Sequence, residues 1–231
     1  MITIRLSKDR GLSVYNWLKS RHTFSFSRYY DPAFMGFFSL RVINEDIVAP
    51  HRGFDSHHHD NMEIISYVIS GVLEHKDSMG NGSLIKPGEI QRMSAGSGVE
   101  HSEQNNSATE PVHFFQIWIL PKVKDIRPSY EQKSIEPFTN GLKLIVSSQP
   151  SASAISINQD IEVYLGRAES GRTISYTGKA GHGIWIQVVS GALSLQGNNL
   201  AAGDGAAITE ELDLQIQATQ ECEFLLFDMV Q

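Results

Sequence analysis

Short apolar segments separated by Gly, Pro, Asn and Asp recur along the whole chain, and this pattern restricts the fold more than any other feature. Clear examples are residues 62–69, 112–119, 184–189 and 224–227. Segments of this length between turn-forming residues are typical of β-strands, whereas helical periodicity is scarce. The Asn-Gly pair in residues 78–82 predicts a hairpin, because it accepts the positive φ angles of tight β-turns. The sequence therefore predicts an all-β fold with few short helical turns, one of them near residues 13–20.

The same order of strands and turns occurs twice in the 231 residues. The matching pairs are IISYVISGVL (64–73) with IWIQVVSGAL (184–193), and PGEI (87–90) with AGDG (202–205). Agreement in both order and spacing indicates an internal duplication. We expect two tandem barrels, with the boundary in the polar, Ser-rich stretch 147–156. The predicted domains are residues 1–146 and residues 147–231.

Composition and charge exclude several classes of protein. Hydrophobic residues make up 41% and charged residues 19%, which is globular composition and excludes a disordered chain. The net charge of −7 argues against a broad phosphate-binding surface, so no direct nucleic-acid partner is expected. Neither a signal peptide nor an apolar run that could span a bilayer is evident, and the single cysteine, Cys222, cannot form an internal disulfide. We therefore expect a soluble, cytoplasmic protein with no membrane partner.

Two clusters of donor side chains predict a metal site in the first repeat. His57, His58 and His59 directly precede an apolar strand, and alternation along a strand places His57 and His59 on one face and His58 on the other. His101 and Glu103 repeat this spacing some forty residues later. If the two strands meet across a barrel, three nitrogens and one oxygen surround a common centre. Such a set suits Fe(II), Mn(II), Ni(II), Cu(II) or Zn(II).

The second cluster carries more weight than the first, because histidine-rich turns are often only solvated. Two glycines in residues 93–99, directly before His101, permit the tight backbone that places a strand end beside a site. The second repeat contains only His182. We therefore expect one metal site, in the first repeat.

The residues around both clusters resemble known motifs. The first cupin motif is similar to Gly53, the His57/His59 pair, Glu63 and Gly71, and the second to Pro87-Gly88, Gly98, His101 and Asn105. More specifically, the chain resembles the bacterial pirins, a two-domain branch of the cupin superfamily. This similarity rests on QRMSAGSGVEHSE at 91–103, with residues 22–26, 30–32, 115–119 and 128–132.

The resemblance implies two tandem cupin (jelly-roll) barrels, the first with a non-haem iron and the second degenerate and without metal. One divalent ion per chain is expected, most simply Fe(II), with Mn(II), Ni(II), Cu(II), Co(II) or Zn(II) as alternatives. It also implies Glu103 as the fourth ligand beside His57, His59 and His101. Many other cupins use the carboxylate that is here Glu63, and strand parity leaves that choice open if the strand runs on unbroken.

The first motif departs from the pirin pattern. Pirins usually have His-Pro-His followed by a basic residue, whereas His58 here replaces the proline and Asp60 and Asn61 follow. The ligand pair is kept. We expect different electrostatics at the rim of the pocket, because an acid replaces a base close to the metal.

The family resemblance also carries a function. Bacterial pirins act as quercetin 2,3-dioxygenases, which open the central ring of a flavonol with O₂, so a flavonol and O₂ are the expected partners and Glu103 the expected general base. The alternative is a metal- or redox-responsive regulatory protein that binds a protein partner, as pirins of nucleated cells do. A cupin isomerase acting on small polar substrates fits the aromatic content of the first repeat less well.

The remaining histidines and aromatics support only broader expectations. Histidines without a partner at ligand spacing are expected to be structural: His22, His51, His75, His113 and His182. Aromatic residues that could line an apolar pocket or simply fill the core are Phe24, Phe26, Phe54, Phe114 and Trp118. Cys222 lies in an apolar segment and is expected to be a buried, inert thiol.

Overall fold

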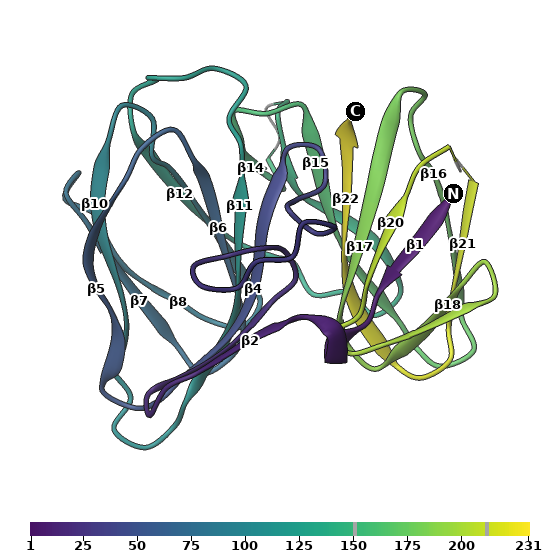
Figure 1. Ribbon diagram of the computed structural model, residues 1–231, viewed down its shortest axis with the longest axis horizontal. Helices are drawn as coiled ribbons and strands as arrows, with labels where there is room; N and C mark the ends of the chain where they lie inside the picture. Colours follow the sequence, from purple (N-terminus) through teal and green to yellow (C-terminus); the bar gives the residue numbers. More distant parts are fainter. Residues whose placement is uncertain (150–151, 211–212) are drawn as a thin grey trace. The chain divides into compact units, whose positions relative to one another are not determined.

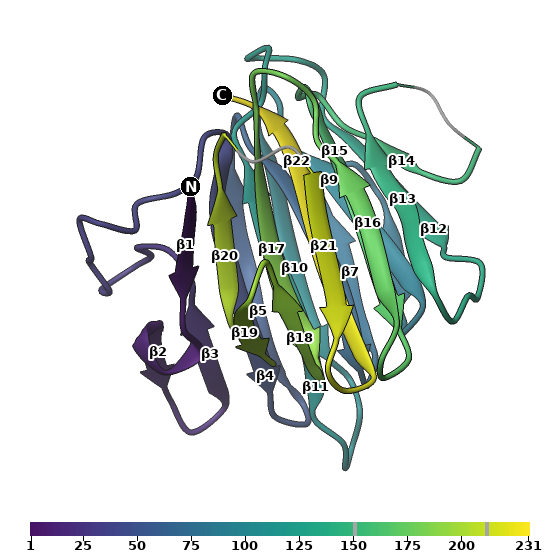
Figure 2. The same cartoon turned by 90° about the vertical axis from the view of Figure 1, so that its right-hand side faces the viewer.

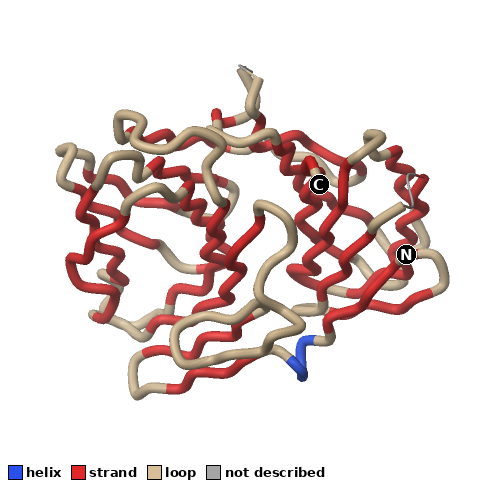
Figure 3. The backbone as a smooth tube through the Cα atoms, turned by 45° about the horizontal axis from the view of Figure 1, so that its top comes forward, coloured by secondary structure: helices blue, strands red, loops and turns tan. Residues whose placement is uncertain are grey.

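β-Strands make up almost all regular structure in the computed structural model, which describes residues 1–149, 152–210 and 213–231 (Figure 1, Figure 3). The single helical element of those residues is a 3-10 turn at Ser7–Asp9. No helix in this part of the chain has the length and apolarity that crossing a bilayer requires. The all-β prediction is confirmed.

The helical turn expected near residues 13–20 is wrong. β2 (Gly11–Val14) and β3 (Leu18–His22) form an antiparallel hairpin there. Side chains along β3 alternate, with Ser20 buried and Lys19 exposed. A period of two residues is that of a strand, and the segment is too short to show a helical period clearly in the sequence.

The chain divides into two compact units, which are described separately. The first unit contains Gly11–Glu136 and Gln149–Gln159, and the second contains Met1–Arg10, Pro137–Ser148 and Asp160–Gln231. Neither unit is one continuous stretch of chain. The predicted division into residues 1–146 and 147–231 instead assigns one continuous stretch of chain to each domain.

The first unit consists of two antiparallel sheets. Their strand orders are β12-β9-β6-β11-β4-β3-β2 and β5-β10-β7-β8. The remaining strands of this unit are β4 (Leu40–Val48), β5 (Arg52–His59), β6 (Glu63–Ser70), β7 (Leu73–Asp77), β8 (Gly82–Ile85), β9 (Glu89–Ser94), β10 (Val99–Asn105), β11 (Val112–Ile119), β12 (Ser129–Ser134) and β14 (Ile155–Ser156). The hairpin predicted at residues 78–82 connects β7 and β8 and is confirmed.

The second unit repeats this arrangement. Its sheets contain the runs β1-β20-β17-β22-β15-β13 and β16-β21-β18-β19, and Figure 2 shows the smaller sheet in front of the larger. The strands are β1 (Ile2–Arg5), β13 (Gly141–Ser147), β15 (Ile161–Ala168), β16 (Thr173–Thr177), β17 (His182–Ser190), β18 (Ala192–Leu195), β19 (Asn198–Ala201), β20 (Gly205–Ile208), β21 (Asp213–Ala218) and β22 (Cys222–Val230). β15 to β22 follow the order of β4 to β11, and β1 lies beside β20 as β12 lies beside β9.

The Ser-Gly turn of each repeat requires glycine for the same two reasons. Gly71 has φ +78° and Gly191 has φ +71°, a region that favours glycine. A Cβ on Gly71 would lie 2.6 Å from the carbonyl oxygen of Pro111, and one on Gly191 would lie 1.8 Å from that of Glu221. The two copies of the sequence pattern therefore correspond to two copies of one strand-turn-strand unit.

The interiors of the two units differ in polarity. In the second unit, aliphatic side chains of both sheets form one large buried cluster, with Leu214, Ile216 and Leu226 among them. In the first unit, a row of polar side chains crosses the larger sheet from strand to neighbouring strand: His22, Asn44, Gln116, Ser66, Gln91 and Gln132. Buried polar groups require hydrogen-bonding partners, so this row marks the part of the first unit whose interior is polar and not filled by aliphatic side chains.

Candidate metal centre

Three histidines meet where β5 pairs with β10. His57 lies directly opposite His101 in the antiparallel register, and His59 lies two residues farther along β5. The ring centroids are 4.5 Å apart for His57 and His101, 4.7 Å for His57 and His59, and 4.9 Å for His59 and His101. One ring nitrogen from each lies within 4.8 Å of the other two, which is the spacing of donors around a single ion.

The state of the imidazoles fits a metal ion. His57 Nδ1 donates to the carbonyl oxygen of Asp55 at 2.7 Å, which leaves its Nε2 as a free lone pair. Both ring nitrogens of His101 are buried without a hydrogen-bond partner, a costly arrangement that a bound cation would relieve. Burial, with neighbouring histidines, lowers the pKa of His59 to about 4 and that of His101 to about 2. Both rings are therefore neutral near pH 7, which is the form that binds metals.

Glu103 lies two residues beyond His101, after a β-bulge in β10. Its carboxylate is buried and accepts hydrogen bonds from Ser66 Oγ at 3.0 Å and from Gln116 Nε2 at 2.5 Å. Burial raises its pKa to about 7, and the nearby charge of Asp46 acts in the same direction. Among the described residues the group of donors within 4.8 Å of one another contains the three histidines and not Glu103.

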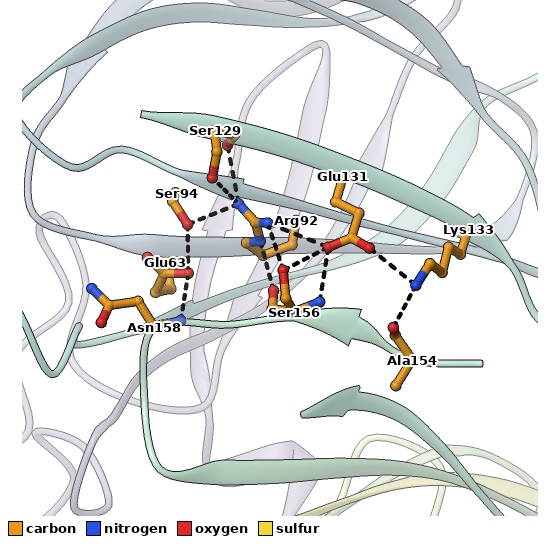
Figure 4. Close-up of polar contacts among 9 residues, drawn as sticks. All are labelled: Glu63, Arg92, Ser94, Ser129, Glu131, Lys133, Ala154, Ser156 and Asn158. Atoms are coloured by element: carbon orange, nitrogen blue, oxygen red, sulfur yellow. Dashed lines mark hydrogen bonds and ion pairs between the residues drawn. The ribbon is translucent and has the colours of Figure 1, made fainter. Parts of the chain in front are cut away.

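Glu63 is directed into a separate polar network. β5 ends at His59 and β6 begins at Glu63 in the other sheet, so the strand does not run on unbroken and the parity argument for Glu63 does not apply. Figure 4 shows the Glu63 carboxylate with Ser94, whose Oγ donates at 2.8 Å, and with the backbone N–H of Asn158 at 3.4 Å. Arg92 lies beside them.

His58 lies on the opposite face of β5 from the cluster, as the alternation predicts. Its side chain is 58% exposed and its Nε2 lies 3.9 Å from Oδ2 of Asp60, which is also exposed. The acidic residue that distinguishes this first motif, Asp60, is thus exposed to solvent. Electrostatic attraction there is strongly screened by water.

A cavity of about 500 Å³ opens beside His57 and His59 in the first unit. Its aromatic wall consists of Tyr15, Trp17, Phe26, Phe54 and Trp118. Its polar wall includes Ser13, Ser20, His22, Asn44, Asp46 and Gln116. A concave, largely aromatic site with a few polar groups is typical of a pocket for a small organic ligand.

Comparison with known proteins assigns the family. A model of the pirin family matches residues 4–119. The chain belongs to the pirin family. A second model, described as the quercetinase C-terminal cupin domain, matches residues 144–229. The tandem cupin fold predicted from the sequence is confirmed.

Relatives of this pirin match it along its whole length. It is 42% identical over 229 residues to a protein of Escherichia coli strain K12 named quercetin 2,3-dioxygenase, covering 99% of each chain. It is 38% identical over 225 residues to a pirin-like protein of Caulobacter vibrioides, covering 94% of this chain and 95% of the relative. The crystal structure of a bacterial pirin from Escherichia coli in complex with nickel(II) superposes with a TM-score of 0.96 at 42% identity, covering 100% of this chain and 99% of the other. The cluster of three histidines and the metal-bound structure of this relative together support a metal-binding site in this pirin.

The cavity separates the aromatic candidates of the sequence into two groups. Phe26, Phe54 and Trp118 line the cavity, whereas Phe24 and Phe114 are fully buried. Two further aromatic residues of the wall, Tyr15 and Trp17, carried no recognisable signal in the sequence. They lie near the β2–β3 hairpin, whose approach to the site depends on the tertiary fold.

Asn44 and Asp46 are the polar residues of the cavity that sequence reasoning missed. They occupy alternate positions on the buried face of β4, and both are 2% exposed. Asp46 accepts a hydrogen bond from the Ser20 side chain, and burial raises its pKa to about 7. The signal available in the sequence was two polar residues in phase with the buried face of a strand.

The other five histidines lie outside the donor cluster. Three donate to a neighbouring carboxylate: His75 to Asp77 at 3.0 Å, His113 to Glu45 at 3.0 Å and His182 to Asp228 at 2.5 Å. His22 donates from Nδ1 to Asn44 Oδ1 at 2.8 Å, and His51 is exposed. His75 is nevertheless close to the centre, since its ring centroid is 5.3 Å from that of His101.

In the described part of the second unit, other side chains take the positions of the donor cluster. When the repeats are aligned and the strand register is followed, Tyr176, Leu214 and Ile216 occupy the places of His57, His101 and Glu103. Within the described ranges no other group of three such donors lies together. Cys222 is buried, as expected, and burial raises the pKa of its thiol.

Proposed function

We propose that this pirin is a metal-dependent dioxygenase that opens the central ring of flavonols such as quercetin with O₂. The observation that carries the proposal is the cluster of three histidines beside a cavity lined by aromatic side chains. A relative that is 42% identical over the whole chain carries the name of this activity. The chain is accordingly a dioxygenase-like oxidoreductase, and its cytoplasmic location stays a prediction.

We further propose that one divalent ion, Fe(II), is held by His57, His59, His101 and Glu103. Glu103 is favoured over Glu63 because it follows His101 on the same strand and is buried beside the cluster. The Glu63 carboxylate instead accepts hydrogen bonds from Ser94 Oγ and from the backbone N–H of Asn158.

The bound ion would supply both a positive centre for the substrate oxygen and the redox chemistry that O₂ requires. The residues of the chain do the rest. The aromatic wall stacks on the flat rings of the flavonol and keeps water from them. Glu103 has a pKa raised to about 7, so it can take up the proton of the substrate hydroxyl near neutral pH, and we assign it the role of general base. Gln116 lines the cavity and fixes the Glu103 carboxylate.

Oxygen consumption tests the proposal directly. Protein loaded with Fe(II) should consume one O₂ for each quercetin bleached and release carbon monoxide, because ring opening destroys the conjugation of the flavonol. The same protein loaded with Zn(II), which has no accessible redox change, should show little turnover. Glu103→Gln should lower turnover by roughly a hundredfold at equal metal content if Glu103 is the general base, whereas His58→Ala should leave it unchanged.

The outcome also separates the two functional hypotheses. Oxygen uptake that stays at the background rate with every redox-active ion and every flavonol would contradict the dioxygenase. The regulatory alternative, in which a protein partner binds the metal-loaded form, would then be the better interpretation. Full turnover in metal-replete Glu103→Gln would remove only the general-base assignment.

A further inference from the structure

One oxygen of Asp46 is unusual among the polar atoms of the cavity. Asp46 lines the cavity and is 2% exposed, and its Oδ1 has no hydrogen-bond partner. Native proteins leave few buried polar atoms unpaired, so such an atom calls for an explanation. The Ser20 side chain donates to the Asp46 carboxylate, which leaves Oδ1 as an open acceptor.

The neighbouring polar groups of the same wall are already paired with one another. His22 donates from Nδ1 to Asn44 Oδ1 at 2.8 Å and accepts at Nε2 from Ser13 Oγ at 2.9 Å. Gln116 is held between Trp118 and Glu103. Asp46 therefore differs from these neighbours, because one of its carboxylate oxygens has an unfilled hydrogen-bonding position.

We propose that Asp46 is a substrate-binding residue whose Oδ1 accepts a hydrogen bond from a hydroxyl group of the flavonol. The inference rests on the proposed function and adds to it a residue that recognises the substrate. A flavonol is a flat aromatic molecule with hydroxyl groups on its edge. The lining of the cavity includes both kinds of group, because it contains aromatic side chains and the Asp46 carboxylate, whose buried Oδ1 has no hydrogen-bond partner.

The charges around Asp46 agree with this role. The titratable and polar groups that interact with Asp46 are Ser20 on β3, Glu45 on its own strand, His113 on β11 and Glu103 on β10. Burial, with the charge of Glu45, disfavours the negative charge of Asp46 and raises its pKa. A hydroxyl donated to Oδ1 would stabilise that charge, so a polyhydroxylated ligand should bind better than the same ring system without hydroxyls.

A ligand-binding experiment separates recognition from catalysis. Protein loaded with Zn(II), kept under nitrogen so that no turnover occurs, is titrated with quercetin and with flavone, the same ring skeleton without hydroxyl groups. The quantity measured is the ratio of the two dissociation constants. Asp46→Leu should lower this selectivity for quercetin about tenfold or more, since a hydrogen bond to a charged group is worth that much in binding. Asp46→Asn keeps the shape and an oxygen acceptor but loses the charge, so it should lose part of the selectivity and lie between wild type and Asp46→Leu.

Glu45→Gln is the matched control, because it removes one negative charge at the adjacent position of β4. Its side chain pairs with His113 at 3.0 Å and does not line the cavity, so the selectivity should stay at the wild-type value. Thermal unfolding of each variant shows whether it is folded. If Asp46→Leu does not fold, Asp46→Asn decides at a pH above 7, where its loss of charge should still reduce selectivity measurably.

Each outcome bears on Asp46 separately from the reaction. Equal losses for quercetin and flavone in the folded variants would mean that Asp46 only shapes the cavity, and this would overturn the inference even if oxygen uptake is normal. Failure of the wild-type protein to bind quercetin would overturn it as well. Asp46-dependent selectivity without oxygen uptake would support the inference and count against the dioxygenase.

Discussion

Gln116 donates a hydrogen bond of 2.5 Å from Nε2 to the Glu103 carboxylate. The direction of this bond is fixed from the other side, because Trp118 Nε1 donates to Gln116 Oε1 at 3.1 Å and an indole nitrogen can only donate. Glu103 is held as an acceptor by Gln116 and by Ser66. Two residues that line the cavity, Trp118 and Gln116, thus set the position of the acidic group next to the histidines.

Apolar residues of the second unit occupy the positions of this arrangement. Leu226 on β22 takes the place of Gln116 on β11, and Ile216 on β21 takes the place of Glu103 on β10. Both belong to the aliphatic cluster between the sheets. The space that holds polar side chains between the sheets of the first unit is filled by aliphatic side chains in the second. Two units with the same fold therefore differ in the side chains that could bind a metal.

Metal content is the first prediction. Purified protein saturated with a divalent ion should retain about one ion per chain after desalting, because only the first unit brings three donors together among the described residues. Elemental analysis against protein concentration measures the ratio. Retention of two tightly bound ions per chain would contradict the prediction and point to a site outside the histidine cluster.

The identity of the ligands is the second prediction. His57→Ala, His59→Ala and His101→Ala should each weaken metal binding by more than about 100-fold, since loss of even an outer-sphere partner commonly costs 10–100-fold. Glu103→Ala should also weaken it, measured by competition with a chelator. Glu63→Gln should leave the metal in place and lower stability, because it disturbs the contacts with Ser94 and Asn158.

The control for this series is His58→Ala, which removes an imidazole from the same strand. Its side chain is exposed on the far face of β5, so metal affinity should match that of the wild type. If Glu63→Gln empties the site while Glu103→Ala keeps the ion, the carboxylate assignment is reversed.

Local patterns predicted much of the fold and of the histidine cluster. Alternation along β5 separated His57 and His59 from His58, and the repeated Ser-Gly turns indicated two copies of one unit. Both signals depend on neighbours along the chain, which a sequence displays directly. The resemblance to pirins then added the bicupin fold and the choice of Glu103.

Pairings between segments that lie far apart in the sequence could not be predicted from such local patterns. β1 lies in the second unit beside β20, although it is the first strand of the chain, and no local signal indicates that pairing. Trp17 and Asp46 reach the cavity because β3 pairs with β4. The strand parity that would have placed Glu63 in phase with His57 and His59 is interrupted locally. Asn61, with a left-handed φ of 46°, lies between β5 and β6.

Gly53 gives the third prediction, because β5 and β10 approach each other closely there. A Cβ on Gly53 would lie 2.2 Å from the carbonyl oxygen of Glu103 and 2.6 Å from Gln104 Cα. Gly53→Ala should therefore displace β5, lower stability by about 1–3 kcal/mol as overpacking does, and weaken metal binding. Gly82→Ala is the control, since nothing lies within 4 Å of its added Cβ. Urea unfolding and chelator competition measure both effects, and equal behaviour of the two variants would refute the steric argument.

Asp46 gives the fourth prediction, on the pH dependence of stability in the metal-free protein. Its pKa rises from 3.8 to about 7 on burial, so the folded state binds the proton more tightly than the unfolded state. The folded state therefore loses stability as the pH rises from about 4 through 7. Asp46→Asn cannot ionise, so its stability relative to wild type should increase over that range, by a few kcal/mol at most.

Urea unfolding at pH 5 and pH 8 measures this difference. Asp60→Asn removes the same charge at an exposed position, 62% of whose side chain is accessible, and should show no comparable change between the two pH values. A stability difference between Asp46→Asn and wild type that is the same at both pH values would show that Asp46 does not titrate in this range.

The last prediction replaces Gln116 by leucine, the residue type that the second unit has at the matching position, Leu226. Gln116→Leu should leave the Glu103 carboxylate with Ser66 as its remaining donor and Trp118 Nε1 without its acceptor. The carboxylate would then be free to turn away from the histidines, so metal affinity should fall about 10–100-fold, as expected for loss of an outer-sphere hydrogen bond. Gln91→Leu is the matched control, because Gln91 belongs to the same polar row and is equally buried.

The two variants make the same chemical change at different distances from Glu103. Gln91 has a buried Oε1 without a partner, so its replacement removes an unsatisfied atom and should cost little stability. The readouts are the metal affinity from competition with a chelator and the rate of metal transfer to it, with thermal unfolding recorded for both proteins. A faster transfer in Gln116→Leu alone supports a specific role for Gln116 in holding Glu103. Equal acceleration in both variants would mean that the polar row acts on the metal site only through general packing of the sheet.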